Sequence, residues 1–272
     1  MDSKREKYSI VTGASQGLGE AISEELASRG KNLVLVALPG EELESLADVL
    51  SERYNIHVEY YETDFSMSHS VYEFASWVND RFQVETLVNN VGIGGQISFA
   101  QSTAEYLDAV IQINIRTVSL LTRLLLDNMK RLDRSYILNV ASMASFSPIP
   151  HKAIYPASKA FVYFLSRTLQ EELKDSNIFV SVVHPGPMMT NARVSQDIIR
   201  QGWVARLGLI STRRIARISV KKLYGHCPFI IPGFSNKLTW LMMKLLPVRL
   251  HLYLGSALTK KQIEPANLTS GL

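Results

Sequence analysis

The chain has almost no cysteine, and Cys227 is the one thiol among its 272 residues. A single thiol cannot form an internal disulfide bond, so the sequence excludes a disulfide-stabilised scaffold and favours a reducing compartment. No Cys–His pattern typical of a thiol nucleophile accompanies Cys227. We therefore interpret it as a buried thiol at the entry to a strand.

Long apolar runs are also missing. Nowhere do eighteen uncharged apolar residues follow one another, as a membrane-spanning helix requires. The opening segment MDSKREKYSIVTG is charged, and it lacks the apolar stretch and cleavage site of a secretory signal. There is no internal repeat, low-complexity segment or Pro/Gly/Ser-rich linker. These features predict a soluble, cytoplasmic protein with one domain over residues 1–272, and no metal site is expected.

Acidic residues are absent from a long C-terminal segment. Between Ile198 and Ile263 there is no Asp or Glu, although the whole chain has 25 acidic and 29 basic residues. The net charge of +4 is therefore unevenly placed, which predicts a local positive field at this end of the chain. The basic residues of the segment are Arg200, Arg206, Arg213, Arg214, Arg217, Lys221, Lys222, Lys237, Lys244, Arg249, Lys260 and Lys261.

Short apolar segments alternate with longer amphipathic segments. Segments such as LVLV and YILNV are apolar on both faces, which is typical of buried parallel strands. The alternation predicts an α/β fold, a Rossmann-like doubly wound parallel sheet with helices on both faces. Strands are expected at YSIVTG, NLVLVA, HVEYYETD, ETLVNN, SYILNVAS, IFVSVVHPG and PFIIPG, and helices at about 17–29, 41–54, from 68 onward, 103–130 and 152–174.

A glycine-rich turn joins the first expected strand to the first helix. A tight turn of this kind needs unusual φ values, and a diphosphate can approach its backbone only where side chains are absent. The helix that follows offers free N–H groups and the positive end of its dipole to an anion. The turn therefore predicts a nucleotide site made by Gly13, Ser15, Gln16, Gly17, Leu18 and Gly19.

The spacing Gly-x-x-x-Gly-x-Gly resembles that of the short-chain dehydrogenase/reductase family. Further motifs of the family follow in order to about residue 190, and Val91 is a mild departure because the family has Ala there. The resemblance implies an enzyme with catalytic residues Asn114, Ser142, Tyr155 and Lys159. It also implies that a nicotinamide cofactor contacts Asp64, Phe65, Asn90, Val91, Gly92, Tyr155, Lys159, Pro185, Gly186 and Thr190.

Tyr155 and Lys159 are four residues apart, so a helix places them on one face. Pro156 suits a first helical turn, which puts Tyr155 at or near the helix start. Free tyrosine has a pKa near ~10 and is a poor acid–base group at neutral pH, but a nearby ammonium stabilises its phenolate. Taken singly, a tyrosine at a helix start is usually a packing residue, and a serine after a strand is usually a cap. Their common order and placement at strand ends favour catalysis.

By resemblance, each of these residues has a role in carbonyl reduction or alcohol oxidation. Lys159 would hold the cofactor's ribose hydroxyls, and Ser142 would orient the substrate oxygen. Asn114 would hold a water in the proton relay. These roles predict hydride transfer between nicotinamide and a carbonyl or secondary alcohol, with Tyr155 as the acid–base group.

The end of the second strand usually decides between NAD and NADP. An acid there binds the ribose hydroxyls, and a base pairs with a 2′-phosphate. Leu38 stands at this position, and Gln16 offers an amide rather than a cation. Because no carboxylate is expected to repel the phosphate, the sequence favours NADP(H) slightly over NAD(H).

The C-terminal part has no such motif. Residues 187–210 are expected to form a substrate lid, and residues 234–272 an apolar tail with Lys and Arg. Pro247 would break any single long helix in that tail. Three interpretations stay open: the tail lies on a membrane surface, its basic field attracts an anionic or acyl-carried substrate, or it packs on the domain with its charges solvated.

Pro185-Gly186-Pro187-Met188-x-Thr190 and a later Pro-Gly before the apolar tail resemble the family branch that includes long-chain 3-oxoacyl reductases. This resemblance implies a hydrophobic or acyl-type ketone as substrate. An alternative is a regulatory protein of the same fold that binds the cofactor without turnover. A nucleic-acid partner is not expected, because no binding motif accompanies the basic tail. The resemblance also implies pairing of the helices at 103–130 and 152–174 in a homodimer or homotetramer.

Overall fold

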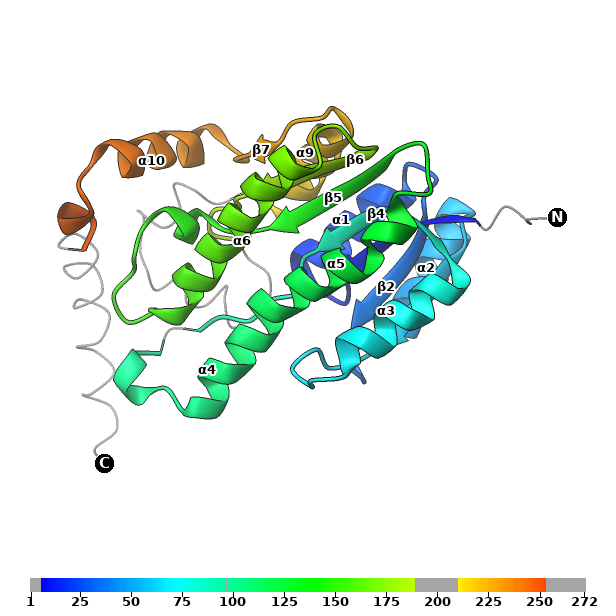
Figure 1. The fold of residues 1–272 in the computed structure, drawn as a ribbon, viewed down its shortest axis with the longest axis horizontal. Helices are drawn as coiled ribbons and strands as arrows, with labels where there is room; N and C mark the ends of the chain where they lie inside the picture. The colour runs from blue at the N-terminus through cyan, green and yellow to red at the C-terminus, as the bar shows by residue number, and fades with distance from the viewer. Residues whose placement is uncertain (1–5, 96, 189–209, 253–272) are drawn as a thin grey trace.

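A single seven-stranded parallel sheet organises the chain, with strands in the order β3-β2-β1-β4-β5-β6-β7 (Figure 1). The computed structural model describes residues 6–95, 97–188 and 210–252. The crossover between β3 and β4 reverses the strand order, as in a doubly wound sheet. The strands are β1 (Lys7–Thr12), β2 (Asn32–Ala37), β3 (Val58–Glu62), β4 (Gln83–Asn89), β5 (Ser135–Val140), β6 (Ile178–Val183) and β7 (Phe229–Ile230).

Burial along the strands follows the apolar pattern of the sequence. All six residues of β5 and five of six in β2 are buried, because helices cover both faces of these inner strands. Edge strand β3 has the sequence VEYYE and contains no fully buried residue. The prediction of a Rossmann-like α/β sheet is therefore confirmed.

Two layers of helices enclose the sheet. The helices α1 (Gly17–Ala27), α2 (Leu43–Tyr54) and α9 (Thr212–Tyr224) share one core cluster on the first face. On the other face, α3 (Ser70–Arg81) and α5 (Thr117–Met129) share a second cluster, and α6 (Ile154–Glu172) packs beside α5. Short 3-10 turns, η1 (Phe99–Gln101) and η3 (Met143–Phe146), follow β4 and β5.

The helix expected over 103–130 has an internal irregularity. It consists of α4 (Ala104–Ile111), a π-helical turn η2 (Gln112–Arg116) and α5. As a whole, Ala104–Met129 is long and apolar enough to cross a membrane by length and composition. Its α5 part, however, packs against α3, and Leu121 and Leu125 are fully buried beside the sheet. These contacts are those of a core helix.

The helix α10 (Phe234–Leu245) extends beyond β7 at the margin of the fold (Figure 1). Asn236 is its only buried residue, and Trp240 packs on Phe229, whereas Phe234, Leu238, Leu241, Met242 and Leu245 are exposed. One side of α10 therefore packs on the domain, while most of its large apolar side chains face away from it. Cys227 is only partly buried and precedes β7, so its expected full burial is also corrected.

Candidate active site

The glycine-rich turn after β1 depends on three glycines. Gly13 and Gly17 have φ values of +64° and +66°, a conformation that L side chains rarely adopt. A Cβ atom on Gly19 would lie 1.8 Å from the Gly13 carbonyl oxygen. Glycine at position 19 therefore allows α1 to begin directly against the turn. This close packing leaves the backbone of the turn open to a ligand.

The N-terminus of α1 has no side-chain cap. Gln16 is the N-cap residue, and its side chain makes no capping hydrogen bond. The first N–H groups of a helix have no partner within the helix, and they attract anions together with the helix dipole. The glycine turn and this uncapped end thus form a cradle that fits the diphosphate of a dinucleotide.

Asn90 fastens the cradle to the end of β4. Its side-chain nitrogen donates hydrogen bonds to the carbonyl oxygens of Thr12 and Gly13, at 2.9 and 3.0 Å. In return, the Thr12 hydroxyl accepts from the backbone N–H groups of Asn90 and Val91, at 3.0 and 3.1 Å. Asn90 therefore shapes the turn through its side chain. Thr12 belongs to the same network, and we did not single it out from the sequence.

A carboxylate lies at the other side of the cradle. The Ser15 hydroxyl donates a hydrogen bond to Glu41, 26 residues away in the sequence. Leu38, at the end of β2, is 46% exposed. The segment from Leu38 to Glu44 contains three glutamates and no Lys or Arg. The sequence-based argument considered only position 38, whereas in the structure the Glu41 carboxylate lies beside Ser15.

Three residues that we predicted to contact the cofactor use their side chains in contacts within the protein. The Asp64 carboxylate accepts from the Ser66 N–H at 2.8 Å. Phe65 is buried and packs on Phe74, with ring centroids 5.8 Å apart. Leu18 is buried in the core. Phe65 and Leu18 can therefore offer only their backbone to a ligand, whereas the second carboxylate oxygen of Asp64 has no hydrogen bond within the described chain.

The π-helical turn η2 carries Asn114 into the site. An extra residue in one helical turn redirects side chains, and such turns are frequent at functional sites. The Asn114 amide oxygen accepts from Ile93 N at 2.9 Å, and its nitrogen donates to Ile93 O at 2.8 Å and to Ser158 Oγ at 2.9 Å. The side chain thus ties the loop after β4 to α6.

Lys159 lies one turn into α6 with its ammonium buried. Its Nζ donates to the carbonyl oxygen of Val140 at 2.9 Å. Burial lowers the pKa of Lys159 to about 8, because a cation loses hydration in the protein interior. A Cβ atom on Gly92 would lie 3.1 Å from this Nζ and 3.2 Å from Asn114 Oδ1. Gly92 therefore brings the loop after β4 close to both polar groups.

Tyr155 is the second residue of α6, as its predicted place near the helix start requires. Its ring centroid lies 6.0 Å from the Lys159 Nζ. Burial raises the pKa of Tyr155, and the Ser142 side chain beside it opposes that rise. Ser142, Tyr155, Lys159 and Asn114 thus form one contiguous group at the carboxyl end of the sheet.

Two residues that we did not predict support this group. The Tyr155 ring packs against Gly94, and a Cβ atom on Gly94 would lie 2.5 Å from Tyr155 Cδ2. His184 lies behind Ser142, with its Nδ1 3.1 Å from the Ser142 carbonyl oxygen. Since a carbonyl only accepts, Nδ1 donates this bond. Burial lowers the pKa of His184 to about 4, so the ring is neutral.

The residues predicted after β6 are placed only in part. Pro185 O accepts from Met143 N at 2.9 Å, which fixes η3 against the end of β6. Gly186 lies against Asn236, because a Cβ there would be 2.5 Å from its Oδ1. Thr190 and most of the expected lid lie outside the described residues.

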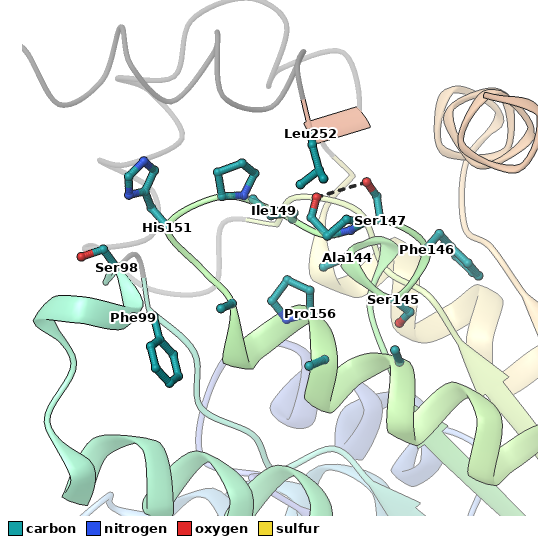
Figure 2. Close-up of a pocket in the computed structure, with 15 residues that line it drawn as sticks. Ser98, Phe99, Ala144, Ser145, Phe146, Ser147, Ile149, His151, Pro156 and Leu252 are labelled. Carbon is teal, nitrogen blue, oxygen red and sulfur yellow. Dashed lines mark hydrogen bonds between the residues drawn. The ribbon is translucent and has the colours of Figure 1, made fainter. Parts of the chain in front are cut away.

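An apolar cavity of about 580 Å³ lies at the start of α6, and Asn114, Ser142, Tyr155 and Lys159 are not among its lining residues. It lies between η1, residues 144–151 and residues 153–160, and its wall is mainly carbon (Figure 2). Leu252, from the C-terminal segment, faces Ala144 and Pro156 across it (Figure 2). The other lining residues are Ser98, Phe99, Ser145, Phe146, Ser147, Pro148, Ile149, Pro150, His151, Ala153, Ala157 and Ala160.

Comparison with known proteins identifies similar chains. The family described as short chain dehydrogenase matches residues 7–198. A very-long-chain 3-oxoacyl-CoA reductase from Anas platyrhynchos is 35% identical over 188 residues. That alignment covers 65% of this chain and 58% of the relative's length. The chain thus matches less than two thirds of that relative.

Solved structures share the fold and bind two forms of nicotinamide. A short-chain dehydrogenase from Sphingobium yanoikuyae, in complex with NADPH, has 27% identity and a TM-score of 0.76, with 88% of this chain and 92% of that one covered. A short chain dehydrogenase/reductase from Burkholderia phymatum, in complex with NAD, has 25% identity and a TM-score of 0.77, with 90% and 94% covered.

Proposed function

The chain belongs to the short-chain dehydrogenase/reductase family, and on that basis we propose that it is a nicotinamide-dependent oxidoreductase of hydrophobic ketones and secondary alcohols. The observation that carries the proposal is that Ser142 lies beside Tyr155 and that the buried Nζ of Lys159, one helical turn away, lies 6.0 Å from the Tyr155 ring centroid. A protein that only binds a cofactor does not need this arrangement of proton donors.

The glycine cradle, Gly92 and Lys159 would hold the cofactor, which supplies a hydride to the carbonyl carbon when bound. Ser142 donates a hydrogen bond to the substrate oxygen and orients it. Tyr155 gives its phenolic proton to the same oxygen, so the carbonyl becomes an alcohol. In the reverse direction, the phenolate takes the alcohol proton.

Lys159 makes Tyr155 a usable acid and base. In the protein alone, burial raises the pKa of Tyr155, which opposes formation of the phenolate. The ammonium of Lys159 favours the phenolate by its charge. Asn114, bonded to Ile93 and Ser158, holds the loop after β4 and α6 together beside Lys159. We assign to it the positioning of a water that returns protons to the site.

The adenosine side of the cradle favours NAD(H). Glu41 accepts a hydrogen bond from Ser15, and no Lys or Arg occurs between Leu38 and Glu44. A 2′-phosphate placed there would face a carboxylate without a compensating cation, which costs free energy. Ribose hydroxyls, in contrast, can donate to that carboxylate. We therefore propose NAD(H) as the preferred cofactor, in place of the NADP(H) that the sequence slightly favours.

The apolar cavity indicates the substrate class. Its wall includes the apolar side chains of Phe99, Ile149, Pro156 and Leu252. An acyl chain or another hydrocarbon chain can therefore pack in it. The likeness to a very-long-chain 3-oxoacyl-CoA reductase supports a 3-oxoacyl thioester. Phe161 and Phe164 are exposed on α6, which supports the expected pairing of this helix in a homodimer or homotetramer.

Tyr155→Phe tests the proposed acid. With a 3-oxoacyl thioester and NADH, we expect kcat to fall by about 10³-fold, since a positioned proton donor contributes about 10²–10⁴-fold. NADH affinity, followed by fluorescence titration, should stay within about threefold. Tyr163→Phe is the matched control, because Tyr163 is on the same helix and its ring packs on Phe146 and His184. Unchanged turnover in Tyr155→Phe would remove the assignment.

A further inference from the structure

Exposed apolar side chains are concentrated near the end of the described chain. Eight of the eighteen large exposed hydrophobic residues in the described ranges fall within residues 234–252. Five of them belong to α10: Phe234, Leu238, Leu241, Met242 and Leu245, which we call the apolar stripe. With 100° between successive helical residues, these five lie within about 100° of the helix circumference. Their exposed fractions range from 45 to 83%.

The opposite side of α10 is fixed to the protein, which makes the stripe face outward. Asn236 is buried, donates to Pro232 O at 2.8 Å and lies against Gly186. Trp240 packs on Phe229, with ring centroids 5.5 Å apart. The helix therefore has a polar and aromatic inner side and an apolar outer side. This is the reverse of the usual arrangement for a surface helix of a soluble domain.

The charged residues beside the apolar stripe indicate which kind of surface binds it. Lys237 and Lys244 lie seven residues apart along one margin of it, and Arg249 follows the helix. Residues 210–252 contain no acidic side chain. A second copy of the same surface would bring these cations together without a counter-charge, and lysine is depleted in protein interfaces. An anionic lipid surface accepts both the apolar stripe and the cations.

The apolar surface continues from the helix to the apolar cavity at the start of α6. After Pro247, Val248 and Leu250 are exposed, and Leu252 is both exposed and part of the cavity wall. Lys222, on α9, and Lys237 also line an apolar groove of about 470 Å³ beside Trp240. Residues 234–252 thus expose apolar side chains on the surface, and they contribute Leu252 to the cavity wall.

We propose that the apolar stripe, together with Val248, Leu250 and Leu252, docks on an anionic lipid surface. Leu252 then lies between that surface and the cavity, so a hydrocarbon substrate enters from the lipid. The docking rests on the exposed side chains of residues 234–252 and does not depend on the catalytic group. The entry route rests on the proposed function, because it assumes that the cavity takes a substrate.

Vesicle binding tests the docking without any catalytic readout. The purified full chain is mixed with vesicles of 1:1 phosphatidylcholine and phosphatidylglycerol, or of phosphatidylcholine alone, and bound protein is measured by flotation. We expect binding to the anionic vesicles that weakens as salt is raised, because salt screens the lysines. The double variant Leu238→Glu/Leu241→Glu should bind about a hundredfold more weakly, since it places two charges in the lipid boundary.

The matched control is Val49→Glu/Met67→Glu, which changes two exposed apolar residues elsewhere and should bind like wild type. Circular dichroism shows that each variant is folded. If wild type does not float with anionic vesicles, the docking is wrong. If Leu238→Glu/Leu241→Glu instead splits a dimer in light scattering, a second copy covers the stripe, and the docking is equally wrong. Vesicle binding with no turnover of any ketone would leave the docking intact and remove the proposed function.

Discussion

Replacing Gly94 by alanine isolates the position of the Tyr155 ring. The added Cβ would lie 2.5 Å from Tyr155 Cδ2 and 2.8 Å from Cε2. Carbon atoms pack at about 3.5–4.0 Å, so the ring must withdraw by about 1 Å. A displacement of that size at a reacting group costs about 10²-fold in rate. We therefore expect kcat to fall about a hundredfold in Gly94→Ala.

The assay is steady-state reduction of a 3-oxoacyl thioester by NADH, with NADH affinity from a separate fluorescence titration. Gly95→Ala is the neighbouring control, because its Cβ would meet Tyr106 Oη at 3.0 Å and Ile97 at 3.7 Å. Those side-chain ends can move without disturbing the group around Tyr155, so kcat should stay within about threefold. Wild-type kcat in Gly94→Ala would refute the assigned role of the Tyr155 ring position. An equal loss in both variants would show that the loop after β4, rather than that ring, carries the effect.

Two further predictions concern His184 and Glu41. Burial lowers the pKa of His184 from 6.5 to about 4, so its neutral form stabilises the fold above pH 6.5, and that contribution is lost as pH falls from 6.5 to about 4. Over the whole interval the free energy of unfolding falls by ~3 kcal/mol, and about 2 kcal/mol of this loss lies between pH 7 and pH 5. Urea unfolding at these two pH values should show a smaller loss in His184→Phe than in wild type, and equal losses would contradict the assignment. Glu41→Gln removes the carboxylate beside Ser15, so the ratio of the NADPH to the NADH dissociation constant should fall about tenfold in paired titrations. An unchanged ratio would mean that Glu41 does not act on the cofactor.

Much of the fold can be predicted from the sequence because its signals are local. Strands buried on both faces need continuous apolar segments, and β2 and β5 have them. The turn after β1 needs glycine at positions that lack room for a side chain, as Gly19 shows. The group around Tyr155 is implied by the resemblance to the short-chain dehydrogenase/reductase family, and it lies at the edge of the sheet that the carboxyl ends of the parallel strands share.

Other features depend on contacts between distant segments. Glu41 reaches Ser15 through the turn after β2, and no spacing rule links these two positions. The π-helical turn at Gln112–Arg116 has no compositional signal, since its residues also suit an α-helix. The apolar stripe of α10 can be recognised in the sequence, but its outward direction depends on the packing of Asn236 and Trp240.

Transfer of deuterium from labelled cofactor tests the central claim most directly. The protein is incubated with NADH deuterated at the transferable position and a 3-oxoacyl thioester, and the product is analysed by mass spectrometry. The account predicts a 3-hydroxyacyl product that carries one deuterium on the carbinol carbon, formed by wild type and about 10³-fold more slowly by Tyr155→Phe. A product without deuterium, or formation at the same rate by Tyr155→Phe, would contradict it.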